Sequence, residues 1–334
     1  IDIGCVANEP SPERVGEIIA LIRDHYDVLL SVDSMHEGEL RAGIDHGVDM
    51  ILSLDLGSYE DFLDIPRNIP IVLLPTRINE GYFPKDPATR VENLFDLTRK
   101  MKEHGFEKLI ADPLLETPIA PGICTSLDSY FEYKKQASVK TDEDLELPLF
   151  FGISNVVELM DVDSPGINGL LASIAIELDM GVLFTVEHST KLMNGVRELN
   201  ECVKLNYISK CKKSPPINQG IQYFKAKGKT SQEMPDITEE DAILVSETSE
   251  AYEPDPNGYF KIYVNHYTRY IYVLFFSLKH DLLETYMGVN AEALSQEIIR
   301  SGLTAHPYHL NYLGRELNNA EFCLHSGRPY IQDE

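Results

Sequence analysis

The stretch KLIADPLLETPIAPG, residues 108–122, decides how the chain is interpreted. Leu109–Ala111 is a short apolar run of the kind that forms a buried strand, and Asp112-Pro113 follows it directly. Because proline cannot continue a hydrogen-bonded ladder, we predict that the strand ends there and leaves the Asp112 carboxylate at its C-terminal end. An isolated Asp-Pro pair would only indicate a turn. Other predicted strands of this chain end in the same way, and together they indicate a site.

Seven short apolar or β-branched runs recur along the first two hundred residues, with helical patterns between them. They lie at residues 1–4, 28–32, 50–54, 69–74, 109–111, 148–153 and 181–186. A spacing of about 25 to 35 residues per unit is typical of parallel β-α-β architecture. A closed parallel barrel needs eight strands, so we expect the missing one to precede Ile1. The prediction is an α/β fold, a (β/α)8 TIM-type barrel whose first strand is missing from this chain.

An open, doubly wound sheet is the alternative architecture. Such a sheet normally carries a glycine-rich turn after its first strand, and no predicted strand here is followed by one. The barrel is predicted to occupy residues 1–205, and a linker rich in lysine and proline to occupy residues 206–255. Residues 256–334 then read as a small α+β domain, with a hairpin over 259–277 and helices over 290–301 and 306–325.

Composition excludes several classes of function. The formal net charge is −25, which disfavours nucleic acid, whose phosphates require lysine and arginine. Five scattered cysteines without a CxxC pair indicate reduced thiols and a cytoplasmic protein, and they give no reason to expect a metal site. No apolar run approaches the length of a membrane span.

Polar residues follow most of the predicted strands. In a parallel barrel these positions converge on one rim, where active sites lie. A carboxylate there can accept two parallel hydrogen bonds, from a ring N–H and from its exocyclic amine. The pyrimidinone edge of a pterin offers that pair of donors. The candidates at the strand ends are Asp33, Asp55, Arg77, Asp112, Asn155 and His188.

Several of these residues belong to motifs that resemble a known family. DIG (residues 2–4), SVDS (31–34) and GVDMI (47–51) resemble the opening of the pterin-binding family that contains dihydropteroate synthase. DPLL (112–115) and GISNV (152–156) are similar to motifs of the methyltetrahydrofolate:corrinoid methyltransferase branch. The resemblance covers roughly the predicted barrel. The C-terminal domain is similar to one appended to dihydropteroate synthase-related proteins of methane-producing archaea.

The resemblance implies a set of pterin-binding residues. They are Asp33, Ser53, Asp55, Arg77, Asp112, Ser154, Asn155 and His188. Leu52 stands near the family's second ring-contacting asparagine, so Ser53 or Asp55 is expected to replace that contact.

Two departures bear on the reaction. The synthases carry a Ser-Arg-Lys motif where this chain has Ser154-Asn155, and an Arg-x-His motif where it has Val186 before His188. Loss of both cations disfavours a condensation that expels diphosphate, because that leaving group needs cationic stabilisation.

The motifs instead favour methyl transfer from N5 of a reduced pterin, of tetrahydromethanopterin or tetrahydrofolate type. Asn155 is the expected catalytic residue, since an amide can donate a hydrogen bond to N5 as the bond to methyl breaks. The acceptor is expected to be a thiol or a corrinoid carried by a partner protein, and the chain is expected to form a homodimer. Two alternatives stay open: a dihydropteroate synthase-like condensation, and a pterin-binding subunit without chemistry of its own.

Overall fold

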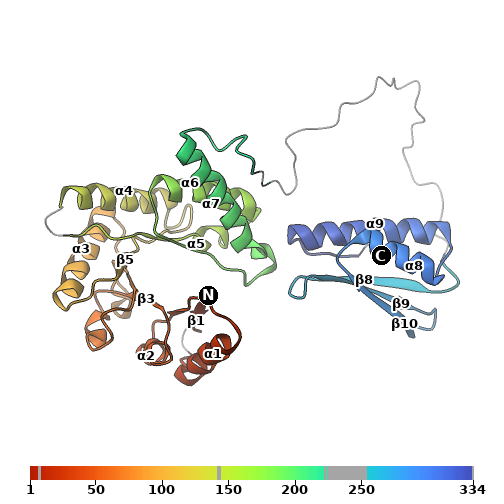
Figure 1. Ribbon diagram of the computed structural model, residues 1–334, viewed down its shortest axis with the longest axis horizontal. Coiled ribbons are helices and arrows are strands. Elements are labelled where there is room, and N and C mark those ends of the chain that lie inside the picture. Colours follow the sequence, from red (N-terminus) through yellow and green to blue (C-terminus); the bar gives the residue numbers. More distant parts are fainter. Residues whose placement is uncertain (7–8, 141–143, 222, 224–253, 333–334) are drawn as a thin grey trace. The chain divides into compact units, whose positions relative to one another are not determined.

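The computed structural model describes residues 1–6, 9–140, 144–221, 223 and 254–332 (Figure 1). The chain divides into two compact units, Ile1–Val186 with Leu199–Ile221, and Glu187–Glu198 with Gln222–Glu334. Most of the linker predicted at 206–255 lies outside the described residues. The part of it that is described includes the end of a helix, which continues to Lys212.

The first unit is built on parallel strands in sequence order. The strands are β1 (Asp2–Gly4), β2 (Ser31–Asp33), β3 (Met50–Leu54), β4 (Ile71–Leu73), β5 (Leu109–Ala111), β6 (Phe150–Gly152) and β7 (Val182–Phe184). Strands β1 to β5 form one sheet and β6 pairs with β7, all in parallel register. A parallel bridge between Ala111 and Leu149 connects β5 to the segment that enters β6. Each strand therefore lies beside the next one along the chain, as barrel topology requires.

The sheet curls around an apolar interior. Leu52 of β3, Val72 of β4 and Phe150 of β6 form one buried cluster, and Val182 and Phe184 of β7 pack against it. The cluster joins side chains from the five-stranded sheet and from the β6-β7 pair, so both parts of the parallel sheet share one apolar interior. The predicted α/β barrel-type fold is confirmed.

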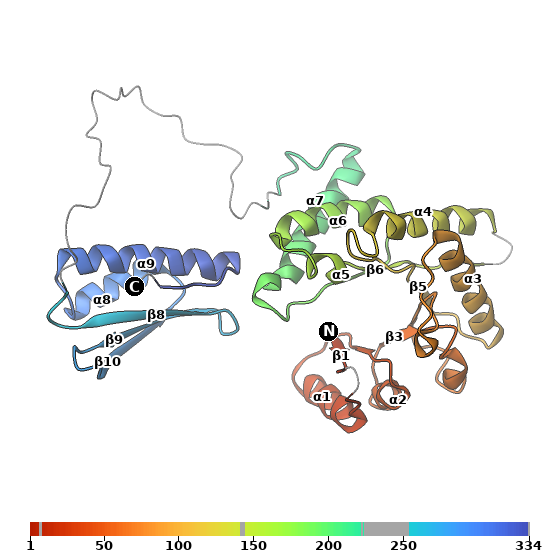
Figure 2. The same cartoon turned by 180° about the vertical axis from the view of Figure 1, so that it is seen from behind.

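Helices cover the outside of the strands (Figures 1 and 2). They are α1 (Pro12–His25), α2 (Glu37–Asp45), α3 (Pro87–Glu103), α4 (Ile123–Val139), α5 (Ser154–Val157), α6 (Ser164–Glu177) and α7 (Gly195–Lys212). The start of α3 illustrates the local signals: Asp86 accepts a hydrogen bond from the Thr89 N–H at 2.9 Å, and Pro87 follows it. None of the helices in the described part of the chain is long and apolar enough to cross a bilayer.

The C-terminal unit contains an antiparallel sheet with two helices on one face. Strands β8 (Tyr259–Asn265), β9 (Tyr270–Phe276) and β10 (Leu282–Gly288) lie in the order β10-β9-β8. Helices α8 (Ala291–Ser301) and α9 (Pro307–Ser326) bury its apolar face. The predicted small α+β domain is confirmed, although sequence reasoning missed β10. Most of that strand is exposed, so it lacks a strong alternation of apolar and polar residues.

A buried acid anchors the second unit. One oxygen of Asp255 accepts hydrogen bonds from Thr304 and, at 2.8 Å, from His309. The three side chains are each about 2% exposed. His309 is therefore a core residue with a carboxylate partner.

Thr304→Val should lower the free energy of unfolding of the C-terminal unit by about 1–2 kcal/mol, because a buried carboxylate loses one donor. Thr268→Val is the control, since the Thr268 hydroxyl is exposed and makes only a 3.3 Å contact with Tyr272. Urea denaturation, monitored by hydrogen exchange of the backbone amides of residues 259–276, measures the free energy of unfolding of both variants. Equal effects would show that the Asp255 cluster does not anchor the unit.

Candidate functional site

A cavity of about 430 Å³ opens at the C-terminal ends of the barrel strands. Its walls combine an apolar side, with Leu52, Val72, Phe150 and Phe184, and a polar side from the strand ends. Residues of the predicted site that line it are Asp33, Ser53, Asp55, Asp112, Ser154 and Asn155. Residues from four separate β-α connections therefore come together, as expected if the strands are parallel.

The other two predicted site residues lie elsewhere. Arg77 follows β4, but it does not line the cavity among the described residues; its guanidinium lies 3.8 Å from Glu80 and 3.5 Å from the Leu56 carbonyl. His188 follows β7 and is exposed. It falls in the segment Glu187–Glu198, which belongs to the C-terminal unit and not to the unit that contains the cavity.

Asp112 is the best-oriented carboxylate of the cavity. Its Oδ1 accepts hydrogen bonds from the Leu114 N–H at 2.8 Å and from the Tyr130 hydroxyl at 3.0 Å. Within the described chain no donor reaches Oδ2, which leaves this oxygen for a ligand. Burial raises the pKa of Asp112 to about 6, although the two hydrogen bonds and the nearby Arg90 oppose that rise.

Asp33 is a second carboxylate of the cavity whose pKa is raised. Asp33 is exposed, yet desolvation by the protein atoms near it raises the pKa of Asp33 to about 6. The carboxylate of Asp2, on the adjacent strand β1, raises the pKa of Asp33 further. Asp2 itself accepts a 2.5 Å hydrogen bond from the Ser31 hydroxyl. Asp33 and Asp112, two of the carboxylates that line the cavity, can therefore change protonation between pH 5 and 7.

Asp55 has a different environment. Its Oδ1 accepts hydrogen bonds from the Gly57 N–H at 2.9 Å and the Ser58 hydroxyl at 3.0 Å. Its Oδ2 accepts from the Thr76 hydroxyl at 2.8 Å and the Ile78 N–H at 2.7 Å. With four protein donors in place, Asp55 ties the loop after β3 to the loop after β4. This geometry favours a positioning role, and it leaves Ser53 as the neighbouring group that is open to a ligand.

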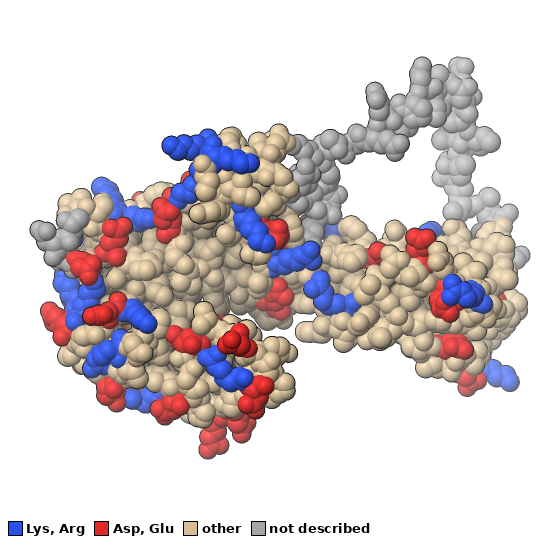
Figure 3. Space-filling model, viewed as in Figure 1, with Lys and Arg blue, Asp and Glu red and all other residues tan. Residues whose placement is uncertain are grey.

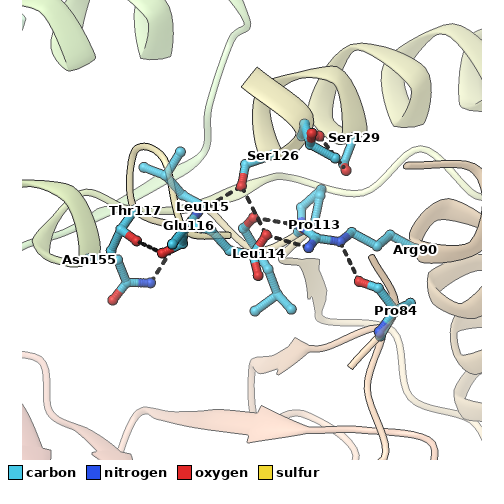
Figure 4. Close-up of polar contacts among 12 residues, drawn as sticks. Pro84, Arg90, Pro113, Leu114, Leu115, Glu116, Thr117, Ser126, Ser129 and Asn155 are labelled. Atoms are coloured by element: carbon cyan, nitrogen blue, oxygen red, sulfur yellow. Dashed lines mark hydrogen bonds and ion pairs between the residues drawn. The ribbon is translucent and has the colours of Figure 1, made fainter. Parts of the chain in front are cut away.

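Asn155 lies at the start of the short helix α5. Its Nδ2 donates to the Leu115 carbonyl at 2.9 Å, so the side chain is tied to the loop that carries Asp112 (Figure 4). The amide keeps one further N–H and its oxygen for a ligand. Ser154, the preceding residue, is buried and also lines the cavity.

The loop after β5 is held by a buried arginine that sequence reasoning missed (Figure 4). Arg90 of α3 donates to the carbonyls of Pro84, Pro113 and Leu114, at 2.9, 3.3 and 3.1 Å, and it pairs with the Glu116 carboxylate. Arg90 is 2% exposed. Arg90 lies beside Val91 on the apolar face of α3. This position could have indicated its role from the sequence, because a charged side chain on an apolar face requires buried partners.

The charged side chains that line the cavity, among the residues described, are all acidic. They include the carboxylates of Asp33, Glu37, Asp55, Asp61 and Asp112. Among the residues that the structure describes there, none is lysine, arginine or histidine. Acidic side chains also gather over α1 and α2 on the outer surface (Figure 3). An anionic ligand would therefore enter an unfavourable field, whereas a neutral or cationic one would not.

About two thirds of the chain is similar in fold to solved structures of dihydropteroate synthases. A Yersinia pestis dihydropteroate synthase in complex with a sulfonamide drug is 18% identical, has a TM-score of 0.48, and covers 64% of this chain and 80% of its own. The 7,8-dihydropteroate synthase of Vibrio fischeri is 21% identical, has a TM-score of 0.42, and covers 64% of this chain and 80% of its own.

Sequence comparisons cover the whole chain. The uncharacterised protein MJ0107 of Methanocaldococcus jannaschii is 31% identical over 338 residues, and the match includes 100% of this chain and 63% of that protein. The chain thus spans less than two thirds of the length of this relative. Residues 254–333 match the family model described as PterinBD-DUF4346. These matches confirm the predicted resemblance to pterin-binding proteins.

Proposed function

We propose that the barrel cavity binds a reduced pterin and transfers its N5 methyl group to a nucleophilic acceptor. One observation carries this proposal: the cavity is lined by carboxylates without a cationic side chain in the described residues, and one oxygen of Asp112 lacks a donor. A pterin ring is neutral, and its pyrimidinone edge carries adjacent N–H donors. Such an edge suits a fixed carboxylate.

The apolar side of the cavity supports the same ligand. Phe150 and Phe184, whose ring centroids lie 5.8 Å apart, form an apolar cluster with Leu52 and Val72 in the cavity lining. A flat heterocycle can contact such a wall with its face while its edge reaches Asp112. The volume of about 430 Å³ lies within the range of small-molecule sites.

The same lining favours methyl transfer over condensation. A condensing enzyme must stabilise a departing diphosphate, and this requires cations or a bound metal. No cluster of three or more metal-binding side chains occurs in the described parts of the chain, and the charged side chains of the described cavity lining are all acidic. Methyl transfer expels no diphosphate: the acceptor forms the new bond to the methyl carbon, and the pterin N5 keeps the electron pair of the broken bond and takes up a proton from solvent.

Asn155 is the residue proposed to assist that step. Its second amide N–H is available once Nδ2 has donated to the Leu115 carbonyl. A hydrogen bond to N5 strengthens as negative charge develops there, so it stabilises the transition state more than the bound substrate. The acceptor is proposed to be a thiol or a corrinoid on a partner protein. We further propose a cytoplasmic homodimer.

Asn155→Ala should lower the rate of methyl transfer by about 10²-fold while it weakens methyl-pterin binding much less. Asn93→Ala is the control, because Asn93 also donates from Nδ2 to a backbone carbonyl, that of Pro75 at 2.8 Å, but does not line the cavity. Calorimetry measures binding, and absorbance of methylcobalamin formed from cob(I)alamin measures transfer. A parallel loss of affinity and rate would contradict the catalytic role.

A two-substrate assay tests the proposal as a whole. One reaction contains a methyl-tetrahydropterin and free cob(I)alamin; the other contains a pterin diphosphate, an arylamine and magnesium. Methylcobalamin in the first reaction supports methyl transfer. Product only in the second reaction would establish the condensing activity instead. Binding of the pterin without turnover in either reaction would indicate a binding subunit.

A further inference from the structure

Tyr130 occupies a position where the ladder between β5 and β6 is interrupted. The Ala111 N–H donates to the Pro148 carbonyl at 2.9 Å, in the parallel register of Ala111 with Leu149. In that register the next donor on β5 is residue 113, which would reach the Phe150 carbonyl. Pro113 has no N–H. The Tyr130 hydroxyl lies 3.1 Å from the Phe150 oxygen, within hydrogen-bond distance of the carbonyl that the missing donor would have reached.

The same hydroxyl reaches the carboxylate of the site. It lies 3.0 Å from Asp112 Oδ1, the oxygen that also accepts the Leu114 N–H. Tyr130 belongs to α4, and its side chain is completely buried. Its ring makes an edge-to-face contact with the ring of Phe151, at a centroid distance of 5.2 Å. Packing therefore fixes the hydroxyl between the end of β5 and the end of β6.

We propose that Tyr130 is a positioning residue of the site: its hydroxyl, held between the ends of β5 and β6, donates to Asp112 Oδ1 and orients the carboxylate so that Oδ2 is left for the ligand. The role of Asp112 as ligand acceptor rests on the proposed function; the orientation of its carboxylate by Tyr130 does not. Asn155 lies three residues after the end of β6, so the hydroxyl lies between the two strand ends that lead to the proposed ligand-binding residues.

The single proton of the Tyr130 hydroxyl supports this arrangement. The hydroxyl has one proton and two acceptors, and it donates preferentially to the ionised carboxylate. Burial raises the pKa of Asp112 to about 6, and the Leu114 N–H, the Tyr130 hydroxyl and the Arg90 charge lower it from what burial alone would produce. The other charged groups nearby are Glu116, which is paired with Arg90, and the carboxylates of the cavity lining.

The test measures Asp112 directly, in the ligand-free full chain. Carbon-13 NMR of labelled aspartate follows its titration in the wild type, in Tyr130→Phe and in Tyr133→Phe. Tyr133 is the matched control: it is buried on the same helix, and its hydroxyl donates to the Leu145 carbonyl at 2.8 Å, away from Asp112. Tyr130→Phe should raise the pKa of Asp112, whereas Tyr133→Phe should leave it unchanged.

A second variant covers the case in which Tyr130→Phe fails to fold. Site-specific 3-fluorotyrosine at position 130 keeps the shape of the side chain and makes the hydroxyl a stronger donor, so the pKa of Asp112 should fall. An unchanged Asp112 titration in both variants, or an equal shift in Tyr133→Phe, would overturn the proposal.

Ligand affinity is measured separately. If the wild type binds a reduced pterin, Tyr130→Phe should weaken binding roughly tenfold at pH 7, as expected for one charge-assisted hydrogen bond. Wild-type protein that binds no pterin would refute the proposed function, and the titration would still decide the role of Tyr130.

Discussion

Asp112→Asn should abolish pterin binding and, at the same time, stabilise the ligand-free protein above pH 6. Binding is lost because an amide presents N–H donors where the ligand also presents donors, and the charged acceptor is gone. Two buried hydrogen bonds without a partner cost several kcal/mol, which corresponds to a loss of at least about 10²-fold in affinity. Calorimetry with a reduced pterin at pH 7.5 measures this effect.

The gain in stability follows from the raised pKa. Asp112 titrates near 6 in the folded protein and near 3.8 when unfolded, so the folded state binds more protons between these values. Its contribution to stability is therefore full below pH 3.8 and is lost as the pH rises through 6. A neutral asparagine avoids that loss, so the variant should be more stable by about 2 kcal/mol at pH 8 and equally stable at pH 4.

Asp64→Asn is the control for charge. Asp64 is exposed and hydrogen-bonded to Arg41, which lowers the pKa of that carboxyl. Its removal should therefore give no gain in stability at pH 8. Urea denaturation at pH 4 and pH 8 compares the variants with the wild type. If Asp112→Asn destabilises the protein at pH 8, the carboxylate is not held in the desolvated state described for the cavity.

Arg90→Met should destabilise the barrel by about 3–5 kcal/mol, because removal of the buried guanidinium leaves its buried partners without a donor and without an opposite charge. Methionine fills much of the volume but leaves the Pro113 and Leu114 carbonyls without their donor and Glu116 without its cation. Leu114 has a φ of 70°, which is unusual for a residue with a side chain, so the loop depends on these bonds to hold that conformation. Pterin affinity should fall as well, since Leu114 donates to Asp112.

Arg41→Met provides the matched comparison. Arg41 also forms several bonds, to Glu37, Asp64 and the Asp61 carbonyl, but its side chain is 35% exposed. Solvent can replace its partners, so the loss of unfolding free energy should stay within about 1 kcal/mol. Urea denaturation of both variants measures the difference. Similar values would mean that burial of Arg90 does not determine the stability of the loop after β5.

Much of the architecture was predictable because its signals are local. Asp-Pro after Leu109–Ala111 ends a strand, and Asp86-Pro87 begins a helix, wherever these pairs lie in space. The seven predicted strands all occur, in sequence order and in parallel. The edge strand β10 was missed because its exposed residues follow no clear alternation.

The sequence by itself determined which residue types stand at the strand ends, since strand periodicity and chain breakers operate over a few residues. It could not determine which of those carboxylates has an oxygen left for a ligand. Asp55 and Asp112 both follow a parallel strand, yet four donors, two of them from the loop after β4, occupy Asp55, whereas Asp112 keeps Oδ2 open. That difference is decided by tertiary structure, because a hydrogen bond depends on the distance and direction of groups that only the folded barrel brings together.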